Sequence, residues 1–235
     1  MKAHFINLDS AATRREALRL HLTAGGFEPV RFAASTPVDL PPILNDLPVL
    51  NEPRQLACLT SHLRLLRQIA AEPGDLDEAV LILEDDCLLR PGLRLDRLLS
   101  KAPPDWQILQ LGLNNPAHTE RLLNLQLKHR ILWVRWEPHF WGAFAYLVRR
   151  SAARLLADRF LPEGAALDLR GTCRPDRGVA DFLLYDNVLT YTKCWPCAAF
   201  RTDFASGIDA EGYDSDIFSR AGHMIQKSWS MAGPG

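Results

Sequence analysis

The 235-residue chain contains no run of the roughly 18 apolar residues that a membrane-spanning helix needs. Its first nine residues hold only a short apolar segment that soon meets a charge, so we expect no secretory signal. The five cysteines are few, odd in number and scattered, which favours a reducing compartment over a disulfide framework. We therefore expect a cytoplasmic protein, and association with the inner face of a membrane stays open.

The chain also lacks an excess of charge of either sign, because 27 lysines and arginines face 28 aspartates and glutamates. Nucleic-acid binding needs a strong basic excess, so we expect no nucleic-acid partner. Apolar residues make up 47% and charged residues 23%, as in ordinary globular proteins, and the length fits one domain. A balanced total charge leaves room for a small acidic pocket.

Apolar segments of two periodicities alternate along the chain. Short apolar runs predict strands at residues 3–8, 26–34, 79–83, 106–111, 131–136 and 188–192, and a further apolar segment at 142–148 leads into a predicted helix. Helical spacing or a helix-start signal predicts helices at residues 13–24, 55–71, 151–157 and 179–185. Five prolines within residues 37–53 predict a surface loop. The alternation indicates an α/β fold with a mostly parallel central sheet flanked by helices.

Three consecutive acids follow the most apolar of these strands. The five residues of segment 79–83 predict a strand buried on both faces, and Glu84, Asp85 and Asp86 follow directly. Ligands of open α/β sheets bind at the carboxyl ends of strands, and Mg²⁺ or Mn²⁺ prefers oxygen ligands. If the strand continues, Glu84 and Asp86 point into one pocket and Asp85 points to the opposite face. An acidic turn without a ligand is the alternative.

Several segments occur together in an order that characterises a known family. They are Ile6-Asn7-Leu8-Asp9 with Arg14-Arg15, Ala57-Cys58-Leu59-Thr60-Ser61-His62-Leu63, Val80-Leu81-Ile82-Leu83-Glu84-Asp85-Asp86, Trp106-Gln107-Ile108-Leu109 and Gly142 to Val148. Weaker matches are Asp181-Phe182-Leu183-Leu184, Thr190-Tyr191-Thr192, Pro196 and Ser206-Gly207-Ile208. On these residues the chain resembles glycosyltransferase family 25, the lipopolysaccharide-biosynthesis type that includes bacterial β-galactosyltransferases.

The resemblance implies one domain of the GT-A type over residues 1–235. Its nucleotide-binding part would be about 1–112 and its acceptor side about 113–208, and residues 209–235, which lack clear periodicity, would be an irregular tail. The implied reaction moves a sugar, with inversion, from a nucleotide-diphosphate donor to a hydroxyl of a glycan or glycolipid. UDP-galactose is the first donor to consider, and Mn²⁺ or Mg²⁺ is the implied metal.

The resemblance also implies roles for individual residues. It places Ile6, Asn7, Leu8, Asp9 and Arg14 on the nucleotide side, Ser61 and His62 facing the donor cleft, and Glu84-Asp85-Asp86 at the metal and diphosphate. The chain departs from the family where residues 10–13 replace an expected Arg-Arg-Thr-Asp, and where Gln55 and Ala57 replace Glu and Gly.

Sugar transfer needs a stabilised leaving group and a base for the acceptor hydroxyl. Asp86, with Glu84, is the expected metal ligand, and His223 is a guess to complete the metal shell. Asp181, at the start of a predicted helix, is the expected general base, with Glu137 in reserve. Arg14 could contact phosphate, or be an ordinary exposed arginine.

Other activities stay open from the sequence. The acidic triplet also suits a metal-dependent phosphoester or nucleotide hydrolase, although no second tight cluster of ligands appears. The altered residues after Asp9 suit a degenerate protein that only binds sugar nucleotide. Cys194 and Cys197 have the spacing of a redox or zinc motif, with Cys173 as a third ligand, but we favour structural burial because no helix signal follows them.

Overall fold

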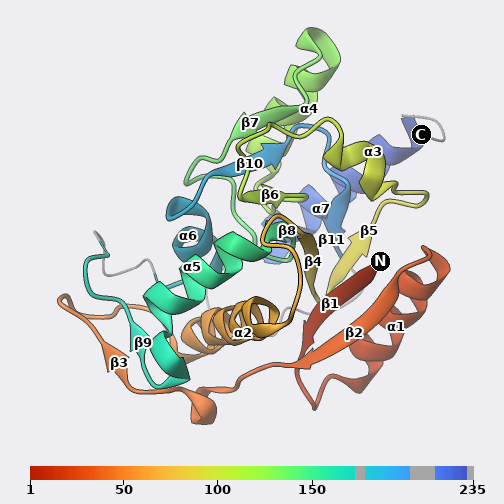
Figure 1. Ribbon diagram of the computed structural model, residues 1–235. Coiled ribbons are helices and arrows are strands. Elements are labelled where there is room, and N and C mark those ends of the chain that lie inside the picture. The colour runs from red at the N-terminus through yellow and green to blue at the C-terminus, as the bar shows by residue number, and fades with distance from the viewer. Residues whose placement is uncertain (173–177, 202–214, 232–235) are drawn as a thin grey trace.

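The computed structural model describes residues 1–172, 178–201 and 215–231 (Figure 1). The strands are β1 Lys2–Asn7, β2 Glu28–Ala33, β3 Ile43–Leu44, β4 Ala79–Glu84, β5 Cys87–Leu89, β6 Ile108–Gln110, β7 Trp133–Arg135, β8 Ala145–Arg149, β9 Leu167–Asp168, β10 Thr190–Lys193 and β11 Ala198–Phe200. The helices are α1 Ala12–Ala24, α2 Pro53–Ala71, α3 Leu95–Leu99, α4 Pro116–His129, α5 Arg150–Phe160, α6 Ala180–Asp186 and α7 Ser215–Met231, with 3₁₀ turns at Pro37–Asp39 and Pro162–Gly164. Cys173 and Ser206-Gly207-Ile208 lie outside the described residues.

A seven-stranded sheet forms the centre of the described chain, in the order β2-β1-β4-β8-β6-β10-β7. Strands β2, β1, β4, β6 and β10 run in one direction, while β8 and β7 run in the other. The α/β fold class is therefore confirmed. The sheet is less parallel than the sequence suggested, because β8 is inserted between β4 and β6 and pairs antiparallel with both.

Strand β4 is buried on both faces, as its apolar run predicts. Val80 and Ile82 belong to the core under α2, α5 and α6, whereas Leu81 and Leu83 belong to the core that includes side chains of α1 and α3. Figure 1 shows α2 and α5 lying together on one side of the sheet. By this alternation the next residue, Glu84, faces α2.

Helix α2 presents one face to the sheet because its leucines recur at helical spacing. Leu56, Leu59, Leu63 and Leu66 are all buried in the same core. The helix begins at Pro53, which suits the first turn, and a capping box between Glu52 and Gln55 satisfies its first backbone groups. The buried side of this helix therefore lies against β4.

The expectation of an irregular tail over residues 209–235 is wrong for residues 215–231, which form α7. Phe218, Ala221, Ile225 and Trp229 recur three or four residues apart, and this spacing gives the helix an apolar face. Ala221 and Ile225 are fully buried, and Trp229 donates its indole N–H to the carbonyl of Pro196 at 2.8 Å.

No helix in the described part of the chain is long and apolar enough to cross a bilayer.

Candidate functional site

A cavity of about 600 Å³ lies at the carboxyl ends of β1 and β4. Residues that the sequence predicted for the site line this cavity: Ile6, Asn7, Leu8, Arg14, Ser61, Glu84, Asp85, Asp86 and Asp181. The cavity also has apolar walls from residues 141–144 and from Phe200 and Phe218. The fold thus brings nine predicted residues, distant in sequence, around one space.

Arg14 binds two of the three consecutive acids, Asp85 and Asp86. It lies in the first turn of α1, where it pairs with Asp85 and donates to Oδ2 of Asp86 at 2.9 Å. Asn7 donates to Oδ2 of Asp85 at 2.6 Å and accepts from Arg31 at 2.9 Å. These bonds tie the ends of β1 and β4 to the start of α1.

The expected alternation of the three acids is wrong in one respect. Asp85 and Asp86 both turn toward Arg14, so they share one partner instead of pointing to opposite faces. The reason is that β4 ends at Glu84 and the two aspartates belong to the turn that precedes β5. Glu84, the last strand residue, keeps the alternation and faces α2.

The surroundings of Asp86 oppose its ionised form unless a cation lies nearby. Burial is the largest cause that raises the pKa of Asp86 to about 8, and the charge of Glu84 is the second. The charge of Arg14 acts in the opposite direction. Its Oδ1 is buried and has no hydrogen-bond partner among the described residues. Burial also raises the pKa of Asp85, against the opposing effects of Arg14 and Asn7. An orphaned carboxylate oxygen beside two more acids fits a divalent cation with oxygen ligands.

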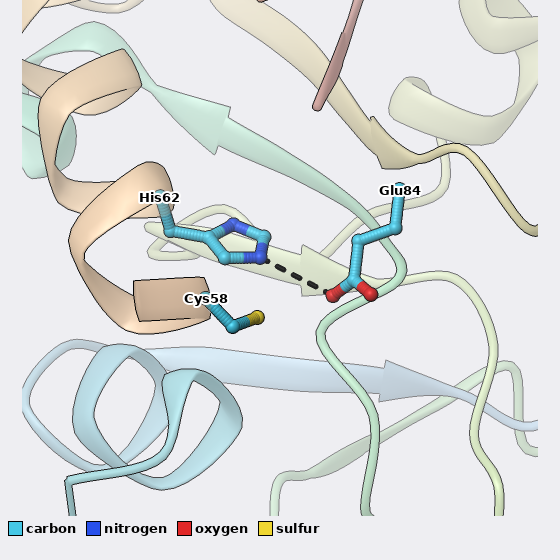
Figure 2. Close-up of side chains that lie close together, drawn as sticks. All are labelled: Cys58, His62 and Glu84. Atoms are coloured by element: carbon cyan, nitrogen blue, oxygen red, sulfur yellow. Dashed lines mark hydrogen bonds and ion pairs between the residues drawn. The ribbon is translucent and has the colours of Figure 1, made fainter. Parts of the chain in front are cut away.

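Glu84 contacts a buried histidine (Figure 2). Nε2 of His62 lies 3.2 Å from Oε1 of Glu84, and Nδ1 lies 3.0 Å from the hydroxyl of Tyr146. His62 and Tyr146 are fully buried, while the side chain of Glu84 is 22% exposed. Ser61 lines the cavity directly, whereas His62 lies behind it and contacts it through Glu84.

Asp181 lies in the first turn of α6 and also lines the cavity. Its Oδ2 accepts the backbone N–H of Gly142 at 2.9 Å and its Oδ1 accepts that of Phe182 at 2.9 Å. Burial nevertheless raises its pKa above the ordinary value. Gly142 has a φ of +111°, and an added Cβ would lie 2.9 Å from Phe144. The segment that positions Asp181 therefore needs glycine here.

Besides His62, three predicted residues do not line the cavity. Glu137 is half-exposed and forms a two-bond ion pair with Arg121 at 2.9 and 3.1 Å. His223 is exposed on α7 and its Nδ1 lies 2.9 Å from the carbonyl of Ser219, one turn earlier. Asp9 is exposed and pairs with Arg31. The structure does not place Glu137 or His223 among the residues that surround the acidic triplet.

Cys194 and Cys197 behave as core residues. Both are buried as free thiols, and burial raises the pKa of each to about 11. Redox or nucleophilic chemistry needs an accessible thiolate, which this environment opposes.

Cys58 is a site residue that our sequence reasoning missed. It lines the cavity one helical turn before His62, and its sulfur, a nitrogen of His62 and an oxygen of Glu84 lie within 4.8 Å of one another. The signal was visible as a Cys–His pair four residues apart on a predicted helix, because such residues share a face.

No protein-family model matches the chain, and no curated protein matches it. Solved structures similar to it include a glycosyltransferase involved in the glycosylation of the major capsid of PBCV-1, with a TM-score of 0.37 and 8% identity over 82% of this chain and 92% of that one. The galactosyltransferase LgtC in complex with donor and acceptor sugar analogs has a TM-score of 0.34 and 12% sequence identity, and the match covers 98% of this chain and 96% of LgtC. Mouse xyloside xylosyltransferase 1 has a TM-score of 0.33 and 9% sequence identity. The match covers 66% of this chain and 55% of the xylosyltransferase. At these scores the likenesses carry no argument about the site.

Proposed function

We propose that the chain is a glycosyltransferase that binds a nucleotide-diphosphate sugar in the 600 Å³ cavity and transfers the sugar to an acceptor hydroxyl. The observation that carries this proposal is the meeting of Glu84, Asp85, Asp86, Arg14 and Asp181 around one cavity at the carboxyl ends of β1 and β4. The family resemblance of the same segments agrees with it.

The acidic end of the cavity would take the diphosphate. Asp86 and Glu84 would hold a divalent cation, Mn²⁺ or Mg²⁺, which when bound offsets the charge that develops on the leaving phosphate. Arg14 lies beside these acids in the first turn of a helix, where its guanidinium can also meet a phosphate oxygen. Ile6 and Leu8 would line the nucleotide side.

Asp181 would act as the base for a single displacement with inversion. As the acceptor oxygen bonds to the anomeric carbon, the bond from that carbon to the diphosphate breaks, and Asp181 takes the proton of the acceptor hydroxyl. Its two backbone hydrogen bonds fix the carboxylate but leave each oxygen a further lone pair. Its raised pKa makes it a better base than an ordinary aspartate near neutral pH.

The donor and acceptor remain proposals at the level of class. UDP-galactose is the first donor that we propose to test, with a glycan or glycolipid as acceptor, in keeping with the lipopolysaccharide-type resemblance. Trp141 lines the cavity and offers an aromatic face on which a sugar ring could stack.

One assay tests the function. The full chain is incubated with Mn²⁺ and a panel of nucleotide sugars, with and without sugar acceptors, and free nucleotide is measured. Release that is specific for one sugar nucleotide and rises with an acceptor supports transfer. Release from plain nucleotides would instead indicate a phosphoester or nucleotide hydrolase, and a metal-dependent thermal shift without turnover would indicate a protein that only binds sugar nucleotides.

A further inference from the structure

The side chains of Cys58, His62 and Glu84 converge, and all three are of types that bind metal ions. Cys58 and His62 lie four residues apart on α2, so both project from the same face of the helix. Glu84 reaches them from the end of β4, and their ligand atoms lie within 4.8 Å of one another (Figure 2). A cysteine sulfur, an imidazole and a carboxylate together form a ligand set typical of zinc, and not of Mg²⁺ or Mn²⁺. Burial, and after it the charge of Glu84, raises the pKa of the Cys58 thiol, so this thiol would lose its proton as the ion binds.

We propose that Cys58, His62 and Glu84 bind one borderline-soft divalent cation such as Zn²⁺. A tetrahedral zinc ion with bonds of about 2.0–2.3 Å holds its ligand atoms roughly 3.5 Å apart. Nε2 of His62 and Oε1 of Glu84 already lie at 3.2 Å, so binding would require mainly that the sulfur of Cys58, which lies within 4.8 Å of its partners, moves closer. Three protein ligands leave one tetrahedral position free. Because Cys58 and Glu84 line the 600 Å³ cavity, that position opens toward the cavity.

The surroundings of His62 suit a metal ligand. Nε2 of His62 lies 3.2 Å from the carboxylate of Glu84, which accepts its proton in a hydrogen bond when no metal is bound, and a bound ion would take the place of this proton. Nδ1, 3.0 Å from the hydroxyl of Tyr146, can then carry the ring N–H and donate it to that hydroxyl. Ligating histidines generally donate their second ring N–H to such a partner, which fixes the ring and its tautomer. Tyr146 is fully buried on β8, which holds this partner in place.

This site shares Glu84 with the cation that we propose at the diphosphate, but its other ligands are different. Asp86 turns toward Arg14, whereas the Oε1 atom of Glu84 turns toward His62. Glu84 can serve either ion through its two oxygens, but Cys58 and His62 belong only to the zinc site. Metal binding there needs neither nucleotide sugar nor acceptor, so it can be tested without the proposed transferase activity.

Cobalt substitution tests the proposal, because a thiolate bound to Co²⁺ gives a charge-transfer band in the near ultraviolet. The starting protein is the full chain with Cys194→Ser and Cys197→Ser, substitutions that remove the cysteine pair with the spacing of a zinc motif. This protein is freed of metal and titrated with Co²⁺ without nucleotide. We expect the band to saturate at one equivalent, to disappear when Zn²⁺ is added, and to be absent from the same protein with Cys58→Ser. A protein with Asp86→Asn should keep the band.

Tyr146→Phe provides a second readout that a purely structural role of His62 would not move. We expect it to weaken cobalt affinity by about 10- to 100-fold while the band stays at the same wavelength. If the Cys194→Ser, Cys197→Ser protein shows no band, or if a folded Cys58→Ser protein keeps it, the proposal is wrong. If the band forms as expected but the unsubstituted protein transfers no sugar in the nucleotide-release assay, that result counts against the proposed function alone.

Discussion

Nη2 of Arg14 lies 2.9 Å from Oδ2 of Asp86 and joins the first turn of α1 to the turn that follows β4. The aspartate is buried, and the arginine side chain is 19% exposed. Arg14 thus supplies part of the positive charge that an acidic triplet at a strand end requires. The unpartnered Oδ1 of Asp86 shows that this arginine alone does not satisfy the acid within the described structure.

Arg14→Ala should lower the free energy of unfolding by about 1–3 kcal/mol, because it leaves buried acids without their hydrogen-bonded counter-charge. Urea titration at neutral pH measures the change. Arg19→Ala is the matched control on the same helix, since the Arg19–Glu16 pair is exposed and its loss should cost less than about 1 kcal/mol. Equal effects of the two substitutions would show that the Arg14 contact does not stabilise the fold.

The free energy of unfolding should fall as the pH rises from about 4 to about 8. The pKa of Asp86 is raised from 3.8 to about 8 in the folded protein, so in this range the folded state holds a proton that the unfolded state has lost. This contribution to stability is complete below the unfolded pKa and is lost as the pH passes the folded pKa. Asp86→Asn should flatten the decline in unfolding curves recorded at several pH values without added metal. An unchanged slope in the variant would assign the decline to other groups.

Asp181→Asn should lower turnover by about 10²-fold or more, since asparagine cannot take the acceptor proton. Steady-state rates with the donor identified by the nucleotide-release assay measure this. Glu137→Gln is the control, because Glu137 pairs with Arg121 away from the cavity lining, and its turnover should stay within about twofold. A large loss of turnover in Glu137→Gln together with near-normal turnover in Asp181→Asn would indicate that Glu137, and not Asp181, is the base.

Cys194 and Cys197 should resist alkylation in the native protein at neutral pH. Burial raises the pKa of both thiols to about 11, so the reactive thiolate is scarce and shielded. Mass spectrometry after brief iodoacetamide treatment, with urea-unfolded protein as the reference, gives the extent of labelling at each cysteine. Rapid native labelling of this pair would revive the redox interpretation.

The sequence predicted the parts of the fold that local pattern controls. The apolar run before Glu84 identified β4, and the leucine spacing identified α2, because burial on one or both faces leaves a period in the sequence. The direction of β8 was not predictable, since the apolar run at 142–148 has the same pattern in a parallel or an antiparallel strand. The pairing of β5 with β11 depends on residues more than a hundred positions apart, which no local pattern reveals.

The sequence identified individual residues of the candidate site but not which of them contact one another. The sequence identified Asp85, Asp86 and Arg14 separately, yet their mutual contact depends on β4 ending at Glu84. His223 was proposed without a local signal and lies on an exposed face of α7. Cys58 was overlooked because the family motif drew attention to Ser61 and His62, although its spacing from His62 was already informative.

Calorimetric titration of UDP into the full chain tests the central claim most directly. If the acids at the end of β4 bind a cation that receives the diphosphate, UDP should bind with Mn²⁺ present, bind at least tenfold more weakly with EDTA, and lose this metal dependence in Asp86→Asn. Binding of equal strength with Mn²⁺ and with EDTA, or full metal dependence in the Asp86→Asn protein, would contradict the account.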